Sequence, residues 1–234
     1  MTKRLAQLSL DPIVRPSVAD QVFEKLHGEI VSLALPPDTR MSEIDVARAL
    51  GTSRQPVRDA FYRLSKLGFL EIRPQRATRV SLISVDMVME ARFVRTALET
   101  EVVRIASERA TEEGIAPLRE NIDGQAKAVM VDDRALFHHL DDEFHRGISV
   151  MSGHPFAWKT ISESKAHLDR VRLLSLSFNQ ANTLEEHRGI LAAIESRDGD
   201  LAVSRMRRHL SRLIEEIDRI RSENRSYFDG GDED

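Results

Sequence analysis

Three histidines and one aspartate in the C-terminal half of the chain have the chemistry to bind a metal ion. Asp141 and His145 are four residues apart in a helix-forming stretch, so their side chains share one face. His187 and His209 each lie at helical spacing among apolar residues (Leu184, Leu191 and Ile194 for the first; Ala202, Met206 and Leu213 for the second). Imidazole nitrogens and a carboxylate oxygen suit a divalent ion, with Zn²⁺ as first choice and Ni²⁺ or Mn²⁺ as alternatives.

Each histidine could instead be a core residue that hydrogen bonds to a neighbour. A carboxylate that faces an apolar stripe is costly unless it is paired or metal-bound, and four inward polar residues on three helices favour one shared site. His138 and Asp142 form a second pair four residues apart, which we expect to face solvent. Because histidine must be neutral to bind a metal, affinity should fall below about pH 6.

The segment from Thr52 to Arg79 has the charge that DNA binding requires. It contains only two acidic residues, Asp59 and Glu71. Its seven basic residues are Arg54, Arg58, Arg63, Lys66, Arg73, Arg76 and Arg79. Neutralising phosphates with such residues releases counterions, although a solvated basic face is the alternative interpretation.

The order of elements around these residues predicts a winged helix-turn-helix. A short helix at 43–50, a turn at 51–53 and a helix at 54–67 precede two short strands around a basic turn at 73–77. The second helix would present its first residues and Arg58 to the major groove, and the wing would contact the backbone or minor groove. The predicted DNA contacts are Thr52, Ser53, Arg54, Gln55, Arg58, Arg76 and Arg79.

Hydrophobic periodicity divides the 234 residues into two domains and two ends. We expect a flexible arm at 1–16, the winged helix-turn-helix at 17–83, a helical domain at 84–223 and an acidic tail at 224–234, of which residues 228–234 should be disordered. The fold class is therefore mainly α, with an antiparallel six-helix bundle after the N-terminal domain. The expected helices span 85–111, 115–131, 133–151, 155–178, 183–197 and 200–223.

Composition excludes several classes of protein. The absence of cysteine excludes disulfides and thiolate metal sites, and no apolar run is long enough for a membrane span or a secretory signal. We therefore expect a cytoplasmic, nucleoid-associated protein. The net charge of −4 is unevenly distributed: residues 1–83 carry 13 Lys and Arg against 9 Asp and Glu, a net of +4.

The N-terminal domain resembles the GntR family of transcription regulators. The resemblance covers about fifty residues, including Pro36–Glu43, Val46–Ala60 and Leu67–Leu70, and it is strongest over the run from Leu50 to Arg58. It implies that Ser53, Arg54 and Arg58 contact an operator. The sequence departs from the family pattern at Asp38 and Ala77, where glycine is usual; the Ala77 methyl group takes space where the wing would approach the minor groove.

The helical domain resembles the FCD effector domain. The resemblance lies in Asp141–His145, Glu186–Ile190 with Ala193 and Ile194, and Met206–Leu210, and six helices would match its VanR-like subgroup. It implies that Asp141, His145, His187 and His209 bind a divalent metal. It also implies that a small carboxylate effector completes the coordination. Within the stretch Arg95–Glu99, which is similar to the family's opening motif, Arg95 is a candidate for the effector carboxylate, or it pairs with Glu99 within the helix.

Together these features predict a homodimeric, ligand-responsive regulator, a repressor, that binds a palindromic operator. We find no convincing general base or nucleophile signature and expect no enzymatic activity. Two alternatives stay open: a metal-dependent hydrolase with an attached DNA-binding module, and a pure metalloregulator for which the ion itself is the signal.

Overall fold

The computed structural model describes residues 16–72 and 77–230, except for the side chains of residues 176–178. The chain divides into two compact units: one contains the chain up to Ile30 together with Ala34–Ser81, and the other contains Val31–Leu33 and the chain from Leu82 onward. The predicted flexible arm lies outside the described residues up to residue 15. No helix among the described residues is long and apolar enough to cross a bilayer.

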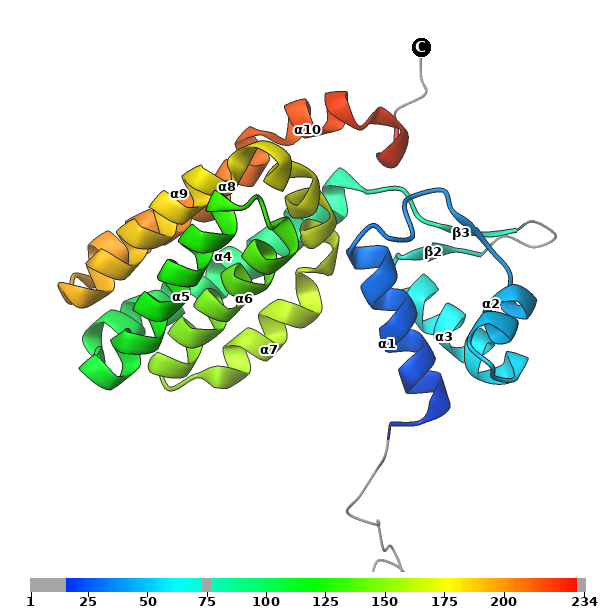
Figure 1. Ribbon diagram of the computed structural model, residues 1–234, viewed down its shortest axis with the longest axis horizontal. Helices are drawn as coiled ribbons and strands as arrows, with labels where there is room; N and C mark the ends of the chain where they lie inside the picture. Colours follow the sequence, from blue (N-terminus) through cyan, green and yellow to red (C-terminus); the bar gives the residue numbers. More distant parts are fainter. Residues whose placement is uncertain (1–15, 73–76, 231–234) are drawn as a thin grey trace, which may run out of the picture. The chain divides into compact units, whose positions relative to one another are not determined.

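The N-terminal unit is a winged helix-turn-helix (Figure 1). Its elements are α1 (Val18–Val31), β1 (Arg40–Met41), α2 (Glu43–Ala49), α3 (Arg54–Lys66), β2 (Leu70–Glu71) and β3 (Thr78–Val80). The sheet is antiparallel with strand order β1-β3-β2, and Arg40 pairs with Arg79 and Leu70 with Val80. Strand β1 was not predicted, because two residues are too few to show alternation.

Local chemistry explains where the two helices of the DNA-binding motif begin and end. The Ser42 hydroxyl accepts a hydrogen bond from the Asp45 backbone N–H at 3.1 Å, which caps α2. The turn between α2 and α3 requires a left-handed residue, and Gly51 provides it with φ 62°. Helix α3 buries Val57, Phe61 and Leu64, the face that the sequence predicted to point inward.

The C-terminal unit is helical, as predicted (Figure 1). Its helices are α4 (Val85–Glu108), α5 (Glu112–Met130), α6 (Arg134–Met151), α7 (Pro155–Ser164), α8 (Ala166–Glu195), α9 (Gly199–Glu215) and α10 (Ile217–Glu223). Helix α4 packs against α6, α7, α8 and α9. A core of apolar side chains from these helices encloses the polar residues of the candidate site.

The predicted break at 179–182 is wrong, because α8 runs unbroken through these residues. The amide of Asn179 donates a hydrogen bond to Glu216 and that of Gln180 donates one to Asp132, each at 2.9 Å. These tertiary partners satisfy polar side chains that would otherwise compete with the helix backbone. The helices are instead interrupted at Lys165 and Glu216, so the described part of this unit has seven α-helices. The six-helix prediction therefore gives no support for the VanR-like subgroup.

The expectation of a disordered tail from residue 228 is wrong for its first residues. Arg225–Tyr227 form a short 3-10 helix, and Phe228 pairs with Ile83 in a parallel β-bridge. The Phe228 side chain is only 1% exposed and packs in a small core with Ile83 and Ile220. Burial of a phenylalanine contributes about 1.5–3 kcal/mol, which helps to hold this segment in place together with its backbone hydrogen bonds to Ile83. Residues 231–234 lie outside the described residues.

Candidate metal centre and nucleic-acid interface

The four metal-binding candidates come together in the interior of the helical unit. Asp141 and His145 lie on α6, His187 on α8 and His209 on α9. One ligand atom from each lies within 4.8 Å of the others. Asp141 is 1% exposed, and its two carboxylate oxygens lie 3.5 Å from His187 Nε2 and 4.0 Å from His145 Nε2. Distances of this size leave room for one ion between the side chains.

Each histidine also contacts a polar partner through its other ring nitrogen. Nδ1 of His187 lies 2.8 Å from Gln125 Oε1, and Nδ1 of His209 lies 3.0 Å from Glu186 Oε2. Nδ1 of His145 contacts Glu99. A partner that accepts the Nδ1–H proton fixes the tautomer in which Nε2 carries a lone pair, the arrangement found around metal-bound histidines.

Burial keeps two of these histidines neutral. It lowers the pKa of His187 well below the ordinary value, and the neighbouring His209 lowers it further. Burial also lowers the pKa of His209, against the opposing effect of Glu186. For Asp141, burial raises the pKa, but Arg172 and the histidines more than offset this and hold it well below the usual range. The cluster therefore offers the neutral imidazoles of His187 and His209 and an ionised carboxylate, the forms that bind a metal.

The donor set fits a divalent metal on geometric grounds as well. Nε2 of both His145 and His187 and Oδ1 of Asp141 are buried and have no hydrogen-bond partner among the described residues. Unsatisfied buried polar atoms are rare and costly, and here they converge on one point. An ion bound there would satisfy them together, and N and O ligands of this kind suit Zn²⁺, Ni²⁺ or Mn²⁺.

Arg172 on α8 is part of the same cluster and was missed by the sequence analysis. Its guanidinium forms an ion pair with Asp141 and lies 3.1 Å from Asp169. These carboxylates raise the pKa of Arg172 despite its burial. The arginine therefore supplies Asp141 with a positive counter-charge within the protein.

The second histidine–aspartate pair does not face solvent, so that expectation is wrong. His138 and Asp142 are partly buried, and with Asp169 they form a cluster whose spacing could hold an ion. Lys165 already lies 2.9 Å from Asp142 and also pairs with Asp169, while Arg172 contacts both carboxylates. Lys165 and Arg172 therefore already supply positive charge to these two carboxylates, with Arg172 also paired to Asp141, which makes this cluster a poor competitor for a metal.

Arg95 forms the intrahelical pair that was one of the two sequence-based alternatives, and its role towards an effector stays a prediction. It pairs with Glu99 four residues along α4, and it also lines a cavity of about 50 Å³ beside Asp141 and His209. The side chain is 3% exposed, and its Nη2 atom has no hydrogen-bond partner among the described residues. Pairing with Glu99 therefore fixes the guanidinium and leaves its Nη2 amino group without a hydrogen-bond partner among the described residues.

The predicted operator contacts lie together at the start of α3, in the N-terminal unit. Ser53, Arg54, Gln55 and Arg58 are exposed and Thr52 is half-buried. One acidic residue, Glu43, lies 3.3 Å from Arg54 and 3.1 Å from Arg58. The hydrogen bond from Arg58 is the main cause that lowers the pKa of Glu43. Glu43 therefore holds the two guanidiniums side by side at the exposed start of α3.

The wing is only partly described. Arg79 on β3 pairs with Asp38, whereas Arg76 lies outside the described residues. Asp38 has φ 66°, a conformation that glycine adopts without strain, which explains why glycine is usual there in the family. Ala77 is exposed and immediately precedes β3.

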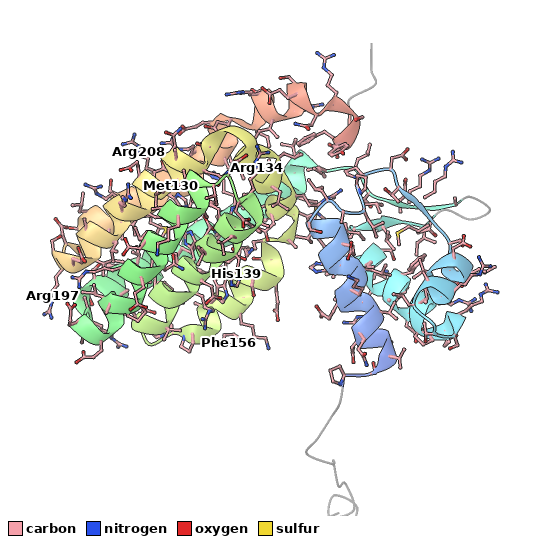
Figure 2. The ribbon with its side chains drawn as sticks, viewed as in Figure 1. Met130, Arg134, His139, Phe156, Arg197 and Arg208 are labelled. Carbon is pink, nitrogen blue, oxygen red and sulfur yellow. The ribbon has the colours of Figure 1, made fainter. Side chains whose placement is uncertain are left out.

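The residues that sequence reasoning missed are the partners of the metal candidates. Gln125 continues the inward-facing series Leu118 and Ile122 of α5, and a glutamine on such a face was a visible sign of a buried polar contact. Glu186 precedes His187 directly, but its contact with His209 depends on how α8 and α9 pack. The residue before His209 on α9 lies on a different side of the helix: Figure 2 shows Arg208 projecting outward.

A winged helix-turn-helix joined to a helical domain with a buried cluster of histidines and an aspartate is typical of a class of DNA-binding transcription regulators. Comparison with known families agrees: residues 18–80 match the bacterial regulatory proteins of the gntR family, and residues 90–212 match the FCD domain. The chain belongs to the GntR family of transcription regulators and carries an FCD domain.

Individual relatives support this assignment over nearly the whole chain. The chain is 36% identical over 213 residues to the HTH-type transcriptional repressor RspR of Escherichia coli K12, covering 90% of this chain and 93% of that protein. A regulator from an unstable DNA locus of Streptomyces ambofaciens is 32% identical, with 88% of each chain covered. The solved structure of E. coli McbR/YncC shares the fold, with a TM-score of 0.72 at 23% identity over 88% of this chain and 99% of that one.

Proposed function

We propose that this regulator is a homodimeric repressor whose FCD domain binds a divalent metal, zinc in the first instance, together with a small organic-acid effector. The observation that carries the proposal is the convergence of four ligand atoms from three helices on one buried point, with Nδ1 of each histidine in contact with a polar partner. Buried polar atoms without partners destabilise a core, and a bound ion would remove that cost.

Asp141, His145, His187 and His209 would hold the metal, and the bound metal would supply a Lewis acid for the carboxylate of an effector. Gln125, Glu99 and Glu186 would orient the histidines. Arg95 would hold the effector carboxylate through its unpartnered Nη2 atom. The adjacent cavity, which Asp141, His209 and Arg95 all line, offers the space.

The DNA-binding half of the proposal rests on α3 and the wing. Ser53, Arg54 and Arg58, with Thr52 and Gln55 beside them, would contact bases and phosphates in the major groove. Arg79 would contact the backbone beside the wing, as would Arg76. A two-fold dimer would place two such helices about 34 Å apart on a palindromic operator. Relatives named as repressors, including RspR of E. coli, support the direction of control.

The test uses the full chain and its His187→Ala variant. Elemental analysis should find about one divalent ion per wild-type chain and little in the variant, which should also melt at a lower temperature. His139→Ala is the matched control, because His139 is an exposed histidine on α6, and it should keep the metal. A His187→Ala protein with full metal content would contradict the ligand assignment.

The same preparation separates the two alternatives. Thermal-shift screening of the metal-loaded protein against organic acids, followed by operator binding, should find acids that stabilise the protein and change its affinity for DNA. Operator binding that follows metal concentration and ignores every acid would identify a metalloregulator. Turnover of small carboxylic or phosphoric esters by the metal-loaded protein would identify a hydrolase.

A further inference from the structure

The cavity beside the metal candidates is lined by an unusual number of arginines. Four of them face it: Arg92 and Arg95 from α4, Arg172 from α8 and Arg212 from α9. The carboxylates that line the same cavity are Asp141 and Glu186. The guanidinium groups therefore outnumber the carboxylate groups in the lining of this cavity. The ion pairs of each arginine show whether its positive charge is balanced.

Three of the four arginines have a carboxylate partner. Arg95 pairs with Glu99. Arg172 pairs with Asp141. Arg212 lies 2.5 Å from Glu186 on the neighbouring helix. These cations are balanced within the protein, so they add hydrogen-bond donors to the cavity without adding much net charge.

Arg92 is different. Within the part of the chain that the structure describes, its hydrogen bond is to the neutral hydroxyl of Ser211, which lies 2.9 Å from Nη2. No ion pair joins it to a described carboxylate, and its Nε atom is buried without a hydrogen-bond partner. A half-buried guanidinium with an unsatisfied N–H is costly, and an anion in the cavity would remove that cost.

Arg92 and Arg95 are three residues apart on α4, so their side chains leave the same face about 5–6 Å from each other. Both have an unsatisfied N–H group and both line the cavity. A ligand with a carboxylate at the end formed by Asp141 and His209 therefore has a second positive group within reach. An effector with a single negative charge would leave the Arg92 charge unbalanced.

From these contacts we infer that the effector is a compact dianionic organic acid, with one carboxylate beside the histidine cluster and a second acidic group bound by Arg92. This inference rests on the proposed function and adds the chemical class of the effector. The cavity is small, about 50 Å³, which favours a short diacid over a long acyl chain or a sugar acid. Arg92 is the residue that selects the second acidic group.

The test is calorimetric titration of the zinc-loaded full-length protein with acids matched in chain length. Malonate is compared with propionate, and succinate with butyrate, and the zinc content is measured after each titration. The wild type should bind the diacid of at least one pair more tightly than its monoacid. In Arg92→Gln that preference should fall roughly tenfold to a hundredfold, the usual effect of losing hydrogen bonds to a charged group.

Two further variants show that the loss is specific. Arg92→Lys keeps the positive charge and should retain part of the preference for diacids. Arg104→Gln removes an arginine from the same helix that does not line the cavity and pairs with Glu101 and Glu108, and it should leave the preference unchanged. Far-ultraviolet circular dichroism and zinc content should match the wild type in all three variants.

The outcomes separate this inference from the proposed function. Equal binding of monoacid and diacid by the wild type would overturn the inference and leave the metal and carboxylate sites standing. An unchanged preference in Arg92→Gln would overturn the role of Arg92. A protein that retains no zinc, or that binds neither class of acid when loaded, would overturn the proposed function and the inference with it.

Discussion

The side-chain oxygen of Gln125 on α5 lies 2.8 Å from Nδ1 of His187 on α8, and both side chains are fully buried. This hydrogen bond orients the imidazole so that Nε2 points to Asp141. The residues are 62 positions apart, so the contact exists only once α5 and α8 have packed.

Gln125→Ala should weaken metal binding about 10- to 100-fold, because removing a partner of this kind frees the ring and its tautomer. Competition with a chelator of known affinity measures the change. Gln55→Ala is the control, since Gln55 is an exposed glutamine in the other unit, bonded to Asp59. Equal metal affinity in Gln125→Ala and wild type would mean that the hydrogen bond has no part in orienting His187.

Arg172→Met should destabilise the metal-free protein strongly. Asp141 would lose its buried counter-charge, and breaking a buried ion pair from one side costs about 3–5 kcal/mol in the free energy of unfolding. Saturating zinc should restore part of the loss, because a ligand that binds only the folded state stabilises it. Urea denaturation with and without zinc measures both effects.

The matched control for that variant is Arg146→Met on α6. Arg146 pairs with Glu143 at the surface, where an ion pair contributes up to about 1 kcal/mol. A loss of similar size in the two variants would show that Arg172 acts as an ordinary surface arginine.

Arg58→Ala should abolish specific operator binding and leave the fold and the proposed dimer intact. The side chain is exposed, and a guanidinium that contacts a base typically contributes about 1–3 kcal/mol of discrimination. Fluorescence anisotropy with operator and scrambled duplexes, at two salt concentrations, measures specificity and the salt dependence together. Operator binding equal to that of the wild type would show that α3 is not the recognition helix.

Acid should destabilise the metal-free protein. The folded-state pKa values of His187 and His209 lie below 6.5, the ordinary histidine value, so below that pH the unfolded chain takes up protons that the folded chain does not. The stability contributed by these histidines is complete above about pH 6.5 and is lost as pH falls towards the lowered folded-state values. Urea denaturation from pH 7.5 to pH 5 measures the change, and the double variant His187→Gln/His209→Gln should show a weaker dependence. A wild-type stability that is flat over this range would contradict the assignment of buried neutral histidines.

Much of the architecture could be predicted from the sequence, because the signals involved are local. Ser42, Gly51 and the apolar face of α3 mark the helix-turn-helix through capping, backbone conformation and periodicity. The helical spacing of Asp141 and His145 places both on one face before any packing is known. These features depend on residues within a few positions of one another.

The breaks between helices were less predictable. Asn179 and Gln180 are typical of a loop by composition, yet they lie inside α8 because Glu216 and Asp132 satisfy their amides from distant parts of the chain. Phe228 similarly has a partner, Ile83, far away in sequence. Local patterns contain no information on such partners.

The sequence by itself determined the winged helix-turn-helix, the helical character of the C-terminal unit and the residue types of the candidate metal set. Only the tertiary structure decided which polar groups surround that set: Gln125 behind His187, Arg172 on Asp141 and Arg92 without a carboxylate partner among the described residues. The physical reason is that helix spacing is set by hydrogen bonds between neighbouring residues, whereas burial and charge balance depend on which helices pack together.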